Sequence, residues 1–150
     1  MTVAETIRRL KSLNLTEIAV SSMKETEKEF IDFNTQKELF VGLDSTGNQI
    51  APLYGSGSYA KKKAAINSLP GYGVPDLKLS GDFYKGMHFV SVTADKAIIE
   101  SSVPYAKYLE KRYGEAIYGL NDKIRPDYIF GPYYSVLKSK VTAVTGFKFS

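Results

Sequence analysis

The feature that most constrains the fold is a run of apolar residues at helical spacing over residues 15–35. The apolar side chains recur at steps of three and four residues, and charged residues cover the opposite side. A chain with this period buries one face of a helix and leaves the other in water. The pattern predicts one long amphipathic helix with an inward face formed by Leu15, Ile18, Ala19, Ser22, Met23, Thr26, Phe30 and Phe33.

A shorter helix is predicted before it. Thr2 and Glu5 have the spacing of a capping box, in which both side chains accept hydrogen bonds from free backbone N–H groups. Asn14 is a favourable N-cap for the long helix. Residues 1–40 are therefore expected to form a helical N-terminal part, and the short helix has an apolar face formed by Ile7, Leu10 and Leu13.

Residues 42–78 are rich in the turn-forming residues Gly, Pro, Asn, Asp and Ser. Within and beside this stretch, residues 39–41 and 49–51 have the composition of two short hairpin strands, and residues 59–66 that of two helical turns. Large apolar side chains also recur here, although a permanently solvated loop has little use for them. We predict a long extended arm that is mobile in the free protein and becomes ordered between subunits.

Residues 79–150 are predicted to form a core of sheet and helices. Residues 87–92 and 97–100 have strand composition and are joined by a hairpin turn. A helix is expected to open at Pro104 and end at Gly114, followed by a short strand over 115–118. A final helix begins near residue 125 and is kinked or delayed at the Gly-Pro pair 131–132. The chain is therefore predicted to be a single α+β domain: N-terminal amphipathic helices, a small antiparallel sheet near 87–100, and C-terminal helices.

The composition excludes several kinds of site. The chain has no cysteine, which excludes disulfides, thiolate metal sites and cysteine nucleophiles, and its one histidine, His88, excludes any site with two imidazoles. We interpret His88, inside a predicted strand, as a half-buried structural residue. No apolar run approaches the roughly 20 residues that span a bilayer, and the N-terminus lacks a basic and then apolar leader. We therefore expect synthesis in the cytosol and no membrane contact.

No motif predicts catalysis. The glycines at 55–57 and the lysines at 61–63 lack the Gly-Lys-Ser/Thr spacing of a phosphate-binding loop. Four carboxylates could be imagined as a two-metal cluster, but their spacing does not support one, and acidic residues beside turns are commonly caps or solvated. We expect no enzymatic activity, metal or cofactor. The four carboxylates are Asp76, Asp82, Asp95 and Glu100.

Charge and aromatic content point to partners. Residues 1–50 carry six basic and eight acidic side chains, whereas residues 51–150 carry fourteen and eight. This asymmetry suits head-to-tail docking or contact with nucleic acid, and an ordinary solvated surface produces it equally. Tyrosine suits interfaces as well as cores, and the chain has eleven. The candidate inter-subunit residues are Tyr54, Tyr59, Tyr72, Tyr105 and Tyr108, and the candidate DNA-facing residues are Lys61, Lys62 and Lys63.

One local order of motifs resembles a known family. Residues 75–87 contain a Leu-x-x-Ser-Gly-x-Phe segment before the predicted hairpin, and residues 103–114 follow it with Tyr-Ala-x-Tyr-x-Glu. This order resembles the head–tail joining and tail-completion proteins of tailed phages. Residues 42–50, with residues 80–84 downstream, are similar to neck proteins of crAss-like phages. The resemblance covers residues 40–140.

The resemblance implies a structural virion protein, made in the host cytoplasm, that forms a homomeric neck ring joining the portal-side complex to the tail. It implies twelve-fold symmetry that matches the portal, and no catalytic residue comes with it. A ring of this kind would make weak, nonspecific contact with genomic DNA. Two other interpretations remain open from the residues: a nonspecific nucleic-acid-binding accessory protein and a small metal-dependent nuclease.

Overall fold

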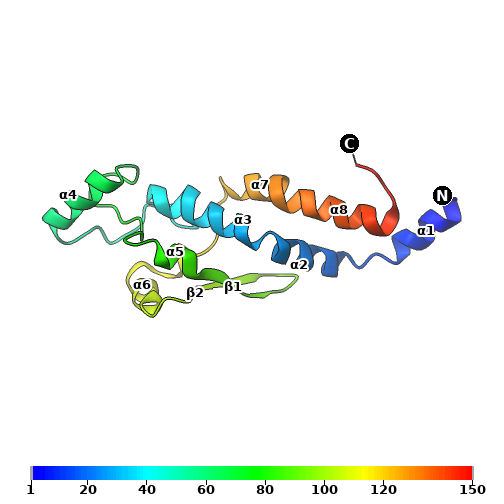
Figure 1. Cartoon of the computed structure of the whole chain (residues 1–150), viewed down its shortest axis with the longest axis horizontal. Helices are drawn as coiled ribbons and strands as arrows, with labels where there is room; N and C mark the ends of the chain where they lie inside the picture. Colours follow the sequence, from blue (N-terminus) through cyan, green and yellow to red (C-terminus); the bar gives the residue numbers. More distant parts are fainter. Residues whose placement is uncertain (1, 150) are drawn as a thin grey trace.

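The computed structural model describes residues 2–149, and the predicted α+β class is confirmed. Figure 1 shows two helical stretches side by side along the long axis, with the β-hairpin and α6 on one side and α4 and α1 at opposite ends. In chain order the elements are α1 (Val3–Lys11), α2 (Leu15–Glu25), α3 (Glu27–Asp32), the π-helical η1 (Phe33–Glu38), the 3₁₀ turn η2 (Leu39–Val41), α4 (Gly57–Ile66), α5 (Asp82–Gly86), β1 (Met87–Val92), β2 (Ala97–Ser101), α6 (Ala106–Tyr113), the 3₁₀ turn η3 (Glu115–Ile117), α7 (Arg125–Tyr128), the π-helical η4 (Ile129–Tyr133) and α8 (Tyr134–Thr145).

Both predicted N-terminal caps are confirmed. The Glu5 N–H donates to Thr2 Oγ1 at 3.1 Å, and the Thr2 N–H donates to Glu5 Oε2 at 3.4 Å. Asn14 Oδ1 accepts from the Glu17 N–H at 3.0 Å. These bonds satisfy backbone donors that have no partner within the helix, so α1 and α2 begin at the residues the sequence predicts.

The long helix predicted over residues 15–35 is interrupted. Thr26 has φ −103° and ψ 21° and separates α2 from α3, and the chain then continues through η1 and η2 to Gly42. The Thr26 hydroxyl donates to the Ser22 carbonyl at 2.8 Å and accepts from the Tyr128 hydroxyl at 2.7 Å. Back-bonding by threonine bends helices, and here a tyrosine from α7 holds the bend in place.

The loop over residues 42–78 is present and contains one regular element. Helix α4 confirms the two predicted turns and begins at Gly57, after an N-cap at Ser56. The predicted hairpin of residues 39–41 and 49–51 is wrong, because residues 39–41 form η2 and the chain makes only an isolated bridge between Leu43 and Gln49.

The hairpin near residues 87–100 is confirmed. Strands β1 and β2 pair antiparallel from Met87 opposite Ser101 to Val92 opposite Ala97, with a bulge between Phe89 and Ser91. The strand predicted over residues 115–118 is wrong, because residues 115–117 form η3. Its carbonyl groups bond to other parts of the chain instead, Ala116 O to the Ser45 N–H at 2.7 Å and Ile117 O to Asn34 Nδ2 at 3.1 Å.

The C-terminal helices agree with the prediction. Helix α6 ends at Tyr113, and its C-cap is the predicted Gly114, which has φ 87°. Helix α7 has a proline in its first turn, and η4 is kinked at Gly131, where φ is −97° and ψ −108°, immediately before Pro132. None of the helices within residues 2–149 has the length and apolar composition that a membrane crossing requires.

The core lies between α3, the hairpin, α6 and α7. Phe30 is at its centre, with its ring edge-on to Phe89 at 5.2 Å and to Tyr128 at 5.1 Å between centroids. Tyr84 and Tyr128 are buried, so part of the tyrosine content fills the core. The buried apolar cluster consists of Phe30, Ile31, Leu39, Ile50, Phe83, Tyr84, Met87, Ala106, Ile117, Leu120 and Tyr128.

Candidate assembly surfaces

Helix α1 presents an uncovered apolar face. It buries none of its residues, and Val3, Ile7 and Leu10 are 77%, 46% and 43% exposed. The helix packs against α8 and projects at one end of the molecule (Figure 1). The predicted apolar face of this helix is therefore real, but its own chain does not bury it.

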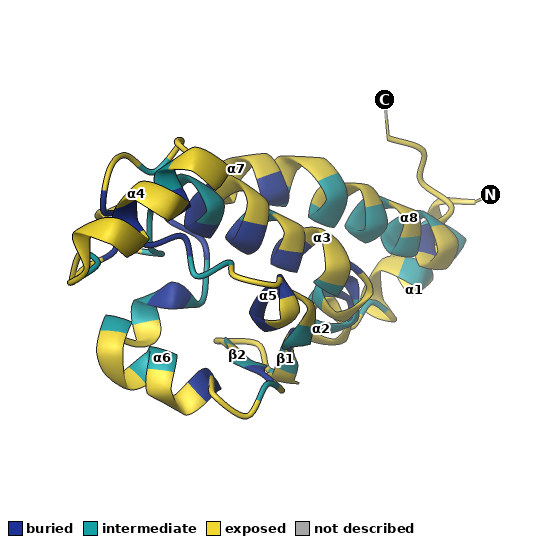
Figure 2. Cartoon of the chain, turned by 60° about the vertical axis from the view of Figure 1, so that its left-hand side comes forward, coloured by how far each residue is buried: buried dark blue, intermediate teal, exposed yellow. Residues whose placement is uncertain are grey.

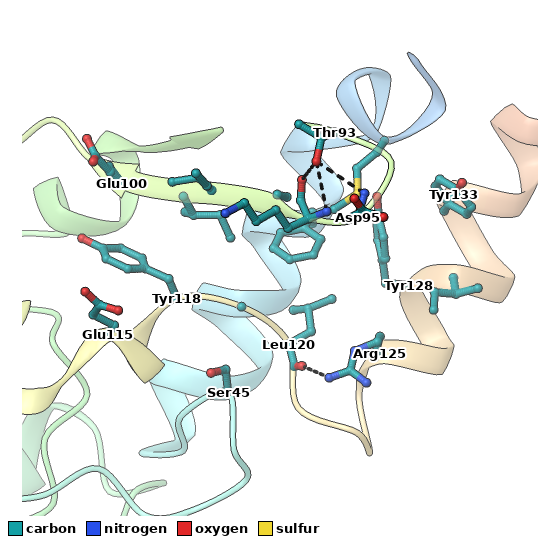
Figure 3. A pocket seen from close by; sticks show the side chains of 18 of the residues that line it. Ser45, Thr93, Asp95, Glu100, Glu115, Tyr118, Leu120, Arg125, Tyr128 and Tyr133 are labelled. Carbon is teal, nitrogen blue, oxygen red and sulfur yellow. Dashed lines mark hydrogen bonds between the residues drawn. The ribbon is translucent and has the colours of Figure 1, made fainter. Parts of the chain in front are cut away.

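A cleft of about 790 Å³, which we call the hairpin cleft, lies between β2, α6 and the α7–η4 segment (Figure 3). Its apolar lining comes from distant parts of the chain: Met23 and Phe30 from α2 and α3, Ile98 and Ile99 from β2, and Leu120, Tyr128, Ile129 and Tyr133. Pockets with an apolar lining and a few polar groups are common binding sites.

Four polar side chains that line the cleft already have partners. Glu110 accepts a hydrogen bond from the Tyr118 hydroxyl at 2.9 Å and pairs with Lys107 at 3.0 Å. Burial, followed by the bond to Glu110, raises the pKa of Tyr118, so its hydroxyl remains a donor. Arg125 pairs with Asp122 at 2.7 Å and donates to the Leu120 carbonyl.

Asp95, Lys96 and Glu115 line the same cleft and form no ion pair with another described residue. All three are exposed, Asp95 and Lys96 in the hairpin turn and Glu115 at the start of η3. Figure 3 shows Asp95 and Glu115 on different sides of the cleft. The rim therefore offers two free carboxylates and one free ammonium group to a partner.

The five predicted contact tyrosines form two separate groups. Tyr54 and Tyr59 stack edge-on with centroids 4.9 Å apart, and the Tyr72 hydroxyl donates to the Gly57 carbonyl at 3.1 Å, so these three gather around the start of α4. Tyr105 and Tyr108 lie at α6 and are 43% and 62% exposed. Figure 2 shows that both α4 and α6 are covered mainly by exposed residues.

The prediction that three lysines face DNA is wrong for one of them. Lys61 and Lys62 are exposed on α4, whereas Lys63 is buried. Its ammonium group lies 2.8 Å from Asp76 Oδ1 and donates to the Lys78 carbonyl at 2.5 Å. A helix turns by 100° per residue, so adjacent lysines cannot all face the same way, and Lys63 points inward.

Asp76 is the centre of a polar cluster that anchors α4. Asn67 Nδ2 donates to Asp76 Oδ2 at 3.0 Å and to the Phe40 carbonyl at 2.8 Å. The buried Tyr84 hydroxyl donates to the Asp76 carbonyl. Through this cluster the arm predicted to be mobile in the free protein bonds to Phe40 and Tyr84 of its own domain. Its exposed large apolar groups are Leu53, Tyr59, Ile66, Leu69 and Tyr72.

The other residues singled out by sequence do not come together. No group of three or more potential metal ligands occurs among residues 2–149, and Asp76 is committed to Lys63. The interpretation of His88 as half-buried is wrong, because its ring is exposed with Nδ1 2.9 Å from the Gly86 carbonyl.

Glu38 is an unusual residue that the sequence did not reveal. Its side chain is fully buried, Oε1 accepts from the Asn121 N–H at 2.5 Å, and Oε2 has no partner among the described residues. Burial raises the pKa of Glu38 to about 7, opposed by the bond from Asn121. Only the tertiary contact with Asn121 distinguishes it from the solvated carboxylates of the same helical stretch.

No protein-family model, curated protein or solved structure matches the chain. The phage resemblance therefore depends on the motifs within residues 40–140 alone.

Proposed function

We propose that this chain is a structural subunit of a tailed-phage neck that assembles into a homomeric ring between the portal-side complex and the tail. The observation that carries the proposal is the exposed apolar face of α1, with Val3, Ile7 and Leu10 in solvent. Burying apolar surface is the main favourable term in protein association, and a capped amphipathic helix with an uncovered face is suited to it.

The supporting features are the hairpin cleft and the two groups of tyrosines, of which Tyr59, Tyr72, Tyr105 and Tyr108 are exposed. A subunit with distinct surfaces on different sides can form head-to-tail contacts, and such contacts close into a ring when the rotation between copies permits. The resemblance suggests a dodecamer located in the virion. In this proposal the ring works by shape alone, without a catalytic residue or cofactor.

Native mass spectrometry and negative-stain electron microscopy of the purified protein test the proposal. We expect the monomer to convert into a closed homomeric ring in one cooperative step as the protein concentration rises. A chain that stays monomeric at all concentrations, and in the presence of a portal complex, contradicts it. Tight binding of such a monomer to DNA favours the accessory nucleic-acid-binding function instead.

A further inference from the structure

We infer that the apolar face of α1 from one copy of the chain docks into the hairpin cleft of the next copy. The inference rests on the proposed homomeric assembly and names the two surfaces that meet in it. The α1 face is an apolar helix surface that its own chain leaves exposed, and the hairpin cleft is a groove with an apolar lining.

The donor surface is short and well defined. Ile7 and Leu10 lie on one side of α1, about one turn apart, and Val3 lies one turn before Ile7. Nine residues make a helix about 13 Å long. The capping box at Thr2 and Glu5 holds the first turn in helical form, so little conformational entropy remains to be lost on docking.

The acceptor surface matches the donor in polarity. Its lining includes Ile98, Leu120 and Tyr128, and a volume of about 790 Å³ accommodates several aliphatic side chains. Ile98, one of the lining residues, is 40% exposed in the single chain. A second apolar surface placed over it would complete the burial that the single chain leaves unfinished.

The free charges are complementary. Helix α1 carries three basic residues and one acidic residue, and Glu5 lies 3.8 Å from Arg9, so Arg8 and Lys11 have no acidic partner within residues 2–149. Among the described residues, the cleft offers Asp95 and Glu115 as carboxylates without an ion pair. Lys96 is the unpaired basic group beside them, and the other basic groups of the lining, Lys107 and Arg125, are already paired. Opposite charges around an apolar contact orient the partners and select the pairing.

The positions of the two surfaces favour contact between copies. Helix α1 packs on α8 of its own chain and contributes no residue to the cleft lining. Figure 1 places α1 at the end of the long axis, whereas the hairpin and α6 lie along the side toward the other end. Joining different surfaces of identical subunits is a heterologous contact, the kind from which rings are built.

Crosslinking between two single-cysteine variants tests the pairing, because the chain has no cysteine of its own. Ile7→Cys protein is mixed with Ile98→Cys protein and treated with a short bis-maleimide. The matched control replaces Ile98→Cys by Ile66→Cys, which changes the same residue type at an exposed position on α4. Circular dichroism confirms that each variant is folded.

We expect roughly tenfold more mixed dimer with Ile98→Cys than with Ile66→Cys, because docking raises the effective concentration of the paired thiols. In the chain without added cysteines, Ile7→Asp should abolish self-assembly, whereas Ile66→Asp should preserve it. Equal crosslinking of both pairs overturns the inference. If rings form without the Ile7–Ile98 crosslink, the inference fails and the proposed ring stands. If the crosslink forms but only open chains or dimers are seen, the ring proposal fails and the docking stands.

Discussion

Lys63 and Asp76 form a buried ion pair with 2.8 Å between nitrogen and oxygen, and it connects α4 to the chain that leads into α5. Their side chains are 7% and 3% exposed. Asp76 also accepts from Asn67 and from the Lys78 N–H, so both carboxylate oxygens are used. A buried charge that is fully paired fixes one arrangement of the segments that carry it.

Lys63→Met is expected to release α4 from the domain. The substitution leaves the Asp76 carboxylate buried without its counter-ion, which costs about 3 kcal/mol of unfolding free energy. Limited digestion with a nonspecific protease should cleave residues 55–63 faster than in the original protein, and urea unfolding should give the loss in stability. The control is Lys62→Met, the same change at an exposed position on the same helix. Identical digestion of the two variants would show that the ion pair does not hold the arm.

Tyr128→Phe is expected to lower the unfolding free energy by about 1 kcal/mol, because it removes the hydroxyl that donates to Thr26 and keeps the ring in the core. Tyr134→Phe is the matched control, since Tyr134 is 41% exposed. Urea unfolding measures both. Equal stability of the two variants would mean that the bend at Thr26 is held by its bond to Ser22 alone.

The parts of the fold set by local chemistry were predictable from the sequence. The caps at Thr2 and Asn14 and the β1–β2 hairpin depend on residues within a few positions of each other. The break at Thr26 was not predictable, because its partner Tyr128 is 102 residues away. The failed strand at 115–118 has the same cause: Asn34, 83 residues away, bonds the Ile117 carbonyl and competes with strand pairing.

The candidate surfaces were predictable only in part. The apolar face of α1 follows from helical spacing, but its exposure depends on what packs against it. The hairpin cleft combines Met23, Ile98 and Tyr128 from three distant segments, and no sequence pattern relates them. The sequence does not distinguish Lys63 from Lys61 and Lys62. The difference comes from the fold, which buries Lys63 in an ion pair with Asp76.

DNA binding by the assembled protein is expected to be weak, independent of sequence and steeply dependent on salt. If Lys61 and Lys62 touch phosphates, replacing both with alanine should reduce the slope of log affinity against log salt by about 2. Fluorescence anisotropy over a salt series measures the slope. Lys111→Ala/Lys123→Ala removes the same charge from α6 and the loop before α7 and serves as the control. An equal slope in both double variants, or tight binding to one sequence, contradicts a passive contact through α4.

Glu38 gives the protein a specific dependence on pH. Its pKa is raised from the ordinary value of 4.5 to about 7 in the folded chain, so the fold favours the protonated carboxyl. The stability from this group is therefore fully present below pH 4.5 and is lost as the pH rises through 7. The loss is on the order of 3 kcal/mol. Glu38→Gln keeps an oxygen acceptor for the Asn121 N–H and has no charge to bury.

We expect Glu38→Gln to be more stable than the original protein at pH 8, and the difference to shrink steadily as the pH falls to 4.5. Urea unfolding at several pH values gives this difference, in which the other titrating groups largely cancel because both proteins share them. Glu29→Gln, a change of the same kind at an exposed position on α3, should show no such trend. A stability difference for Glu38→Gln that stays constant from pH 4.5 to 8 would show that the buried carboxylate does not titrate in this range, and that its effect on stability comes from packing alone.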